Sequence, residues 1–211
     1  GHIGSFPKTN KEKYHSVVLG ADKAIYCVPF NARRVLRVNP VTDSVELIGD
    51  DLGGGKQKWN GGALANDGCI YCAPETAAKV LCIDTRVRTT SLIGADYSKL
   101  AKYKWAGAVL ARDGCVYFPP TDTARQFLRV DPTTRTTSLV GDELEGVLKY
   151  SSAAIAPNGR IYCCPSTARR SLVFDPADGS CRFIGDDWGA AMGKFAGTVL
   201  GADGCLYGIP F

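Results

Sequence analysis

The feature that most constrains the fold is a short phrase that the 211-residue chain repeats five times. Each copy has a lysine, an aromatic residue and, two positions later, serine or glycine. The copies begin at Lys13-Tyr14, Lys58-Trp59, Lys104-Trp105, Lys149-Tyr150 and Lys194-Phe195, so the lysines are 45, 46, 45 and 45 residues apart. A second phrase, Tyr-x-x-Pro, keeps the same spacing and begins at Tyr26, Tyr71, Tyr117, Tyr162 and Tyr207. Two markers in phase over five copies indicate a repeat protein.

The second copy shows what one repeat contains. Residues 61–65 are a small apolar run that ends at Asn66-Asp67-Gly68, and Asp-Gly between two apolar runs predicts a hairpin. Residues 69–72 predict a second strand, which Pro74 stops because proline lacks the N–H that a strand ladder needs. Residues 80–83 and 89–93 predict a third and a fourth strand. No stretch carries a convincing helical period, so the sequence predicts an all-β fold.

Four short strands per 45 residues resemble one blade of a β-propeller. Phrases such as Asp67-Gly68-Cys69-Ile70-Tyr71 and Val80-Leu81-Cys82-Ile83-Asp84 are similar to kelch- or NHL-like repeats, a resemblance that implies the architecture and no activity. We therefore predict one domain, 1–211, that forms a five-bladed β-propeller of four-stranded antiparallel blades. Its repeat units are 13–57, 58–103, 104–148 and 149–193, and the last blade is incomplete (194–211) and closed by the N-terminal segment 1–12.

Three sets of side chains are expected to gather on one face, because loops before strand one and after strand two emerge together in a propeller. The first set is the five lysine–aromatic pairs. The second is basic and follows each Tyr-x-x-Pro, and the third is acidic and follows each fourth strand. The candidate binding residues are Lys13, Lys58, Lys104, Lys149, Lys194, Trp59, Trp105, Arg33, Arg34, Arg125, Arg169, Arg170 and Trp188.

These residues allow two interpretations. A ring of cations beside aromatic rings suits an anionic ligand, a glycan or an acidic peptide. Alternatively, each lysine pairs with an acidic residue of its own or the next loop, and the aromatic residue is a wedge between blades. Exposed pairs of this kind contribute little, so a single repeat lysine is then expected to have little effect on stability.

Catalysis finds little support in the sequence. The chain has two histidines, and the predicted first strands contain no acidic residue, so a catalytic carboxylate would have to come from a loop. Cys69 and Cys72 lie at positions that point to opposite faces of a strand, which argues against a shared metal ion. We therefore predict no catalytic residue, no metal and no cofactor.

The sequence thus predicts a non-enzymatic binding or scaffold module for a protein partner or larger complex, monomeric alone. The contact residues are expected in loops that differ among blades: 50–57, 142–148 and 186–192. The alternative is a lectin-like or anionic-ligand binder. A net charge of +4 with interleaved signs argues against nucleic acid, and no apolar run is long enough for membrane insertion. Nine cysteines, an odd number, predict free thiols and an intracellular location.

Overall fold

A computed structural model describes residues 12–211, which form antiparallel sheets and no helix. The first two sheets contain β1 (Tyr14–Leu19), β2 (Ile25–Pro29), β3 (Val35–Asn39), β4 (Ser44–Ile48), β5 (Trp59–Leu64), β6 (Cys69–Pro74), β7 (Val80–Asp84) and β8 (Thr89–Ile93). The next two contain β9 (Val109–Leu110), β10 (Val116–Phe118), β11 (Phe127–Asp131), β12 (Thr136–Val140), β13 (Ala154–Ile155), β14 (Ile161–Cys163), β15 (Ser171–Phe174) and β16 (Cys181–Ile184). The last sheet pairs β17 (Phe195–Leu200) with β18 (Leu206–Pro210).

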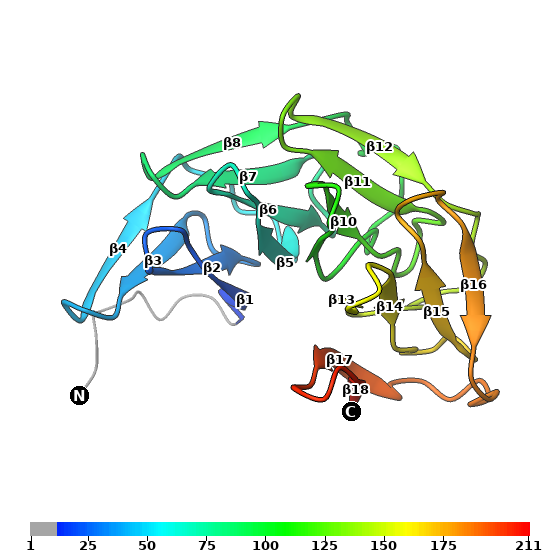
Figure 1. Cartoon of the computed structure of the whole chain (residues 1–211). Helices are drawn as coiled ribbons and strands as arrows, with labels where there is room; N and C mark the ends of the chain where they lie inside the picture. Colours follow the sequence, from blue (N-terminus) through cyan, green and yellow to red (C-terminus); the bar gives the residue numbers. More distant parts are fainter. Residues whose placement is uncertain (1–11) are drawn as a thin grey trace.

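The sheets follow one another around a common centre, as blades of a propeller do (Figure 1). Within each four-stranded sheet the strands pair in chain order, so each blade is a simple meander. The first strands lie nearest the centre and the fourth strands at the periphery (Figure 1). The prediction of an all-β fold built from four-stranded antiparallel sheets is therefore confirmed.

Small residues let the first strands converge at the centre. Gly61 has a φ of +85°, and a Cβ added to it would lie 2.6 Å from the backbone of Gly107 in the next blade. The backbone N–H of Gly107 donates to the carbonyl of Asn60 at 3.1 Å, and that of Gly61 donates to Oγ of Ser16 at 3.0 Å. Any side chain at Gly61 would therefore force two blades apart.

The aspartate of the Asp-Gly turns makes the same pair of hydrogen bonds in several blades. In the second blade, one oxygen of the Asp67 carboxylate accepts the backbone N–H of Cys69 at 3.0 Å, and the other accepts the hydroxyl of Tyr71 at 2.8 Å. The same arrangement recurs at Asp22 with Tyr26, at Asp113 with Tyr117 and at Asp203 with Tyr207. Each turn is thus fixed to the strand that follows it.

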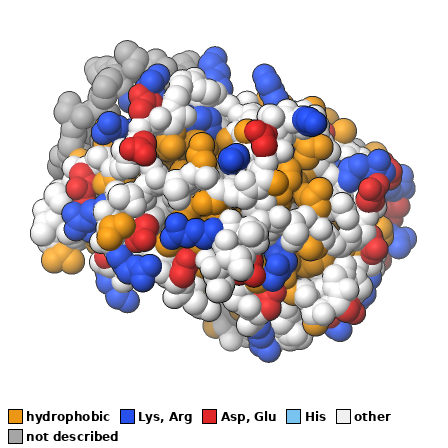
Figure 2. Space-filling view, turned by 90° about the horizontal axis from the view of Figure 1, so that it is seen from above, with side chains coloured by type: hydrophobic (Ala, Val, Ile, Leu, Met, Phe, Trp, Pro, Cys, Tyr) orange, Lys and Arg blue, Asp and Glu red, His pale blue; other side chains and the backbone are white. Residues whose placement is uncertain are grey.

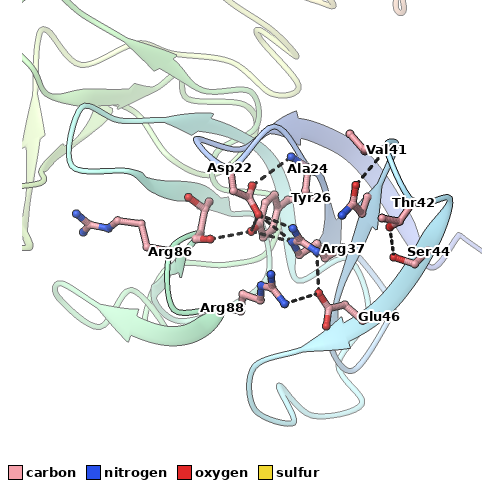
Figure 3. Close-up of polar contacts among 12 residues, drawn as sticks. Asp22, Ala24, Tyr26, Arg37, Val41, Thr42, Ser44, Glu46, Arg86 and Arg88 are labelled. Carbon is pink, nitrogen blue, oxygen red and sulfur yellow. Dashed lines mark hydrogen bonds and ion pairs between the residues drawn. The ribbon is translucent and has the colours of Figure 1, made fainter.

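In the first blade these hydrogen bonds continue into a polar cluster that reaches the neighbouring blade (Figure 3). The buried Arg37 guanidinium donates to Asp22 at 2.6 Å and to Glu46 at 2.8 Å. Glu46 also pairs with Arg88 of the second blade at 3.3 Å, and the Tyr26 hydroxyl, which shares its one proton between Asp22 and Thr85, lies 3.1 Å from the carbonyl of Thr85. This polar cluster therefore stabilises the contact between the first two blades as well as the turn.

The fifth sheet has only two described strands, so the predicted blade number and closure stay predictions. The segment 1–12 that was expected to close it lies outside the described residues except for Glu12. Side chains on β1 and β17–β18 are exposed to an unusual degree for a blade: Val17, Leu19, Val199, Leu200, Tyr207 and Ile209. All nine cysteines are free thiols. Residues 12–211 contain no helix with the length and apolar character needed to cross a membrane.

Candidate functional site at the channel mouth

The repeat lysines lie in the packing between blades. Lys58, Lys104 and Lys149 are 5%, 1% and 2% exposed. Their ammonium groups donate to main-chain carbonyls of the preceding blade and loop. These bonds run from Lys58 to Ala32 (2.6 Å) and Gly55 (3.1 Å), from Lys104 to Glu75 (3.2 Å), from Lys149 to Asp122 (2.8 Å) and Gly146 (2.9 Å), and from Lys194 to Thr167 (3.1 Å) and Ala191 (2.6 Å).

The same lysines join blades through their main chain. The backbone N–H of Lys104 donates to the carbonyl of Glu75 at 3.0 Å, and the carbonyl of Lys104 accepts the N–H of Thr121 at 2.9 Å. Lys58, Lys149 and Lys194 repeat this pattern. The premise that the repeat lysines are exposed is therefore wrong for Lys58, Lys104 and Lys149. Their predicted binding role stays a prediction.

The two tryptophans that follow repeat lysines are buried wedges between blades. Trp59 and Trp105 are 2% and 0% exposed, and their indole N–H groups donate at 2.9 Å to the carbonyls of Lys79 and Gln126. The ammonium of Lys58 lies 5.8 Å from the centre of the Trp59 ring, so the expected cation–aromatic contact exists there, away from solvent.

The arginines, rather than the lysines, pair with the acidic loops. Arg33 contacts Asp51 at 2.6 Å and Arg169 contacts Asp187 at 2.7 Å, while Arg125 pairs with Glu143 at 3.3 Å and also with Glu145. The interpretation that pairs each lysine with an acidic loop is therefore wrong for Lys58, Lys104, Lys149 and Lys194, because their ammonium groups are bonded to main-chain carbonyls. Arg34 and Arg170 are exposed. Figure 2 shows basic and acidic side chains interleaved on the face that it presents.

Three predicted residues meet in one groove between the third and fourth blades. Lys149, Arg169 and Arg170 line this groove, whose volume is about 740 Å³, together with apolar side chains that include Val147, Phe183 and Met192. Trp188 is 53% exposed and meets the ring of Phe195 edge-on at 5.8 Å. Lys13, Arg33 and Arg34 belong to the first blade and do not line the groove.

A second cavity, of about 650 Å³, occupies the mouth of the central channel. The residue before each repeat lysine has a positive φ: Glu12 (53°), Gln57 (56°), Tyr103 (62°), Leu148 (48°) and Gly193 (66°). This conformation is uncommon for residues other than glycine. The first four line the mouth, so one equivalent position presents four different side chains there.

The loops after the second strands supply the other side of the mouth. Phe30, Glu75 and Phe211 occupy equivalent positions after the three Tyr-x-x-Pro phrases of their blades, and Asp122 lies one residue further along its own loop. His15 and Asn60 complete the lining from the first strands. The mouth therefore combines carboxyl groups, an imidazole, amides and aromatic rings, whereas the lysines of the same loops lie beneath it.

Three polar side chains form a chain of contacts in this mouth. Nδ1 of His15 lies 3.0 Å from Oδ1 of Asn60, and the ring of His15 stacks on Phe30 at 4.9 Å. Since an amide oxygen only accepts, this contact is a hydrogen bond in the tautomer that carries its proton on Nδ1, in which Nε2 has the free lone pair. Asn60 also lies close enough to the Glu75 carboxyl group to lower its pKa. This arrangement links an imidazole to a carboxyl group through one amide.

Glu75 has the environment of a general acid. Its Oε2 atom is buried and has no hydrogen-bond partner among the described residues. Burial raises the pKa of Glu75 to about 7, and the hydrogen bond from Asn60 and the charge of Lys104 oppose that rise. A carboxyl group with a pKa near neutrality holds or releases a proton at physiological pH, as general acids and bases do.

The raised pKa of Glu75 predicts how the free energy of unfolding depends on pH. Between the ordinary glutamate pKa of 4.5 and about 7, the folded state keeps a proton that the unfolded chain releases. The free energy of unfolding of the wild type should therefore fall as pH rises through this window. Glu75→Gln, which does not titrate, should lack this fall. Urea denaturation of both proteins at pH 4.5, 6 and 7.5 measures it, and parallel pH profiles would contradict the raised pKa.

Sequence reasoning missed Glu75, Asn60 and Tyr103 because it looked for similarity among the repeats. These residues are identified instead by a difference among the repeats at equivalent positions. Glu75 stands where other blades have phenylalanine, threonine or serine, and Asn60 stands where they have histidine, alanine or serine. Gln57 and Leu148 do lie in two of the variable loops that were expected to make contacts.

The fold and the mouth define a β-propeller with a polar cavity on its axis. No protein-family model matches the chain, and no curated protein matches its sequence. Solved structures do match. A streptogramin B lyase is 12% identical and superposes with a TM-score of 0.76 over 97% of this chain, which spans only 65% of that protein. A catalytically inactive virginiamycin B lyase from Staphylococcus aureus, with quinupristin, is 8% identical with a TM-score of 0.72 over 97% of this chain and 72% of its own.

A third similar structure is a putative gluconolactonase, 15% identical with a TM-score of 0.66 over 93% of this chain and 71% of its own. These neighbours are β-propeller-like proteins, so the predicted resemblance to propellers is confirmed, and the finer kelch-like assignment is not. The prediction of a non-enzymatic scaffold or assembly module is contradicted, because these neighbours carry enzyme names and none of them indicates a scaffold role. At 8–15% identity the likeness itself shows the fold alone.

Proposed function

We propose that the channel mouth is the active site of an enzyme that transfers protons to and from a small molecule. The observation that carries the proposal is the buried, unpartnered Oε2 of Glu75, a residue that lines the same cavity as the His15–Asn60 pair. A buried oxygen without a partner costs free energy, and a site that binds a ligand is one place where such a cost is retained. The cavity volume is in the range of small-molecule sites.

In this proposal the two groups have complementary roles. Nε2 of His15 acts as the base, because Nδ1 is held as a donor by Asn60. Glu75 acts as the acid, because burial keeps its carboxyl group protonated up to a pKa of about 7. One base and one acid suffice for an elimination, and equally for addition of water to a lactone or ester. The hydroxyl of Tyr103, which donates to Oε1 of Gln57 at 3.1 Å, is placed to bind substrate.

The names of the similar proteins suggest the substrates to try first. We would incubate the wild type with quinupristin, with glucono-lactone and with a p-nitrophenyl ester, and follow product by mass spectrometry, pH-stat and absorbance. Loss of a general acid typically lowers the rate by about 10²–10⁴-fold, so Glu75→Gln should do so with at least one of these substrates. Glu143→Gln, which changes an exposed carboxylate outside the mouth, should not.

Two outcomes would contradict the proposal. The first is an activity that Glu75→Gln and His15→Gln leave intact. The second is a wild type that turns over none of the three substrate classes while the Glu75 carboxyl titrates at its ordinary pKa. Melting temperatures of both variants near that of the wild type would show that a loss of activity is not a loss of fold.

A further inference from the structure

Among the carboxylate, lysine and arginine side chains, only carboxylates line the part of the channel mouth that the structure describes. Three carboxyl groups line it, those of Glu12, Glu75 and Asp122, and no lysine or arginine side chain does among the described residues. None of the three forms an ion pair within residues 12–211. The repeat lysines nearest to this cavity are bonded to carbonyls beneath it. The face that was expected to bind anions therefore presents negative charge at its centre.

Aromatic rings accompany these carboxyl groups. Phe30 and Tyr103 line the cavity from the first and third repeats, and Phe211 is 92% exposed at its edge. Carboxylates together with aromatic rings are a combination that binds organic ammonium groups. A metal ion is a poorer fit, because residues 12–211 contain no group of three histidine, cysteine or acidic side chains placed to ligate one.

We propose that the channel mouth binds a small organic cation, a molecule that carries an ammonium group. This inference rests on the proposed function only for the place of the site, and it adds the chemical class of the substrate. The ammonium lies between the carboxyl groups and the rings, and the rest of the molecule reaches His15 and Asn60. The distinct side chains at Glu12, Gln57, Tyr103 and Leu148 give the mouth the asymmetry that recognition of one orientation requires.

Binding of a cation should be linked to the ionisation of Glu75. The groups that face this carboxyl are Asn60, the ammonium of Lys104 beneath it, His15 beyond Asn60, and Glu12, Tyr103 and Asp122 across the mouth. A bound cation favours the charged carboxylate, so affinity should rise from pH 6 to pH 8.

The test compares choline with 3,3-dimethylbutan-1-ol, which has the same shape without the charge, by isothermal titration calorimetry. Choline should bind the wild type about tenfold more tightly than the alcohol at pH 8. Glu75→Gln should lose most of that preference and its pH dependence, whereas Glu143→Gln, outside the mouth, should keep both.

Other results would overturn the inference. Equal binding of choline and the alcohol would show that the mouth has no preference for a cation. The proposed proton-transfer activity would still stand, because it is measured with separate substrates. Absence of choline binding at millimolar concentration, or a preference that survives in Glu75→Gln, also overturns it. Displacement of choline by Mg²⁺ at lower concentration would assign the mouth to a metal ion instead.

Discussion

Replacing Trp105 with alanine should lower the free energy of unfolding by about 3–5 kcal/mol, the range seen when a fully buried large aromatic side chain is removed. The Trp105 ring is 0% exposed and meets the ring of Tyr97 edge-on at 5.0 Å. It also belongs to a cluster with Val116 and Phe118 that joins the second and third blades. The substitution leaves a cavity at that junction and an unbonded carbonyl at Gln126.

Trp188 provides the matched control for this experiment. It is also a tryptophan at a blade junction, but it is 53% exposed. Trp188→Ala should lower the free energy of unfolding by about 1 kcal/mol or less, because the half-exposed Trp188 side chain buries little apolar area on folding. Urea denaturation followed by circular dichroism measures both values. Near-equal losses for the two variants, or an unfolding transition of Trp105→Ala within about 0.5 kcal/mol of the wild type, would refute the wedge role.

The repeat itself was predictable because its signals are local. Asp67-Gly68 and Tyr71 with Pro74 each specify a turn or a strand end within a few residues. The structure places β6 at Cys69–Pro74, which contains the predicted strand 69–72 and extends it by two residues. The four-stranded meander follows from four such segments joined by short connections. The closing of the fifth sheet depends on contacts between distant parts of the chain, which no local signal specifies.

The burial of the lysines was not predictable from the pattern of charges. Acidic loops occur in every complete repeat, and a lysine beside them suggests an exposed pair. In the structure the arginines make those pairs, across 18 residues for Arg33 with Asp51 and for Arg169 with Asp187. The partners of the lysines are main-chain carbonyls, and a sequence does not display where its carbonyls lie.

The mouth was overlooked for a related reason. The search for catalytic carboxylates covered the first strands, and the structure brings Glu75 to the channel from the loop after a second strand. Sequence reasoning did require any such carboxylate to come from a loop. Comparison of the five equivalent loop positions would have singled out Glu75, because it is the acidic member of that set.

Replacing Lys149 with methionine should lower the free energy of unfolding by about 2–3 kcal/mol at pH 7, although sequence reasoning expected almost no effect. Methionine keeps the apolar stem but leaves the carbonyls of Asp122 and Gly146 without their donor, and each buried carbonyl left unpaired costs about 1–3 kcal/mol. Relief of the buried charge offsets part of this loss. Lys102→Met, at an exposed lysine, is the control and should stay within about 0.5 kcal/mol of the wild type.

The pH dependence of the same pair tests whether the buried amine is the cause. Burial lowers the pKa of Lys149 to about 8, with a further contribution from Arg125 that the charge of Asp122 opposes. Between about pH 8 and the ordinary lysine pKa of 10.5, the unfolded chain holds a proton that the folded state has released. Wild-type stability relative to Lys149→Met should therefore rise through this window, since the unfolded state binds more protons there. A stability difference between the two proteins that stays constant from pH 7 to pH 10 would contradict the lowered pKa of Lys149. It would also contradict the burial of the Lys149 ammonium group between blades.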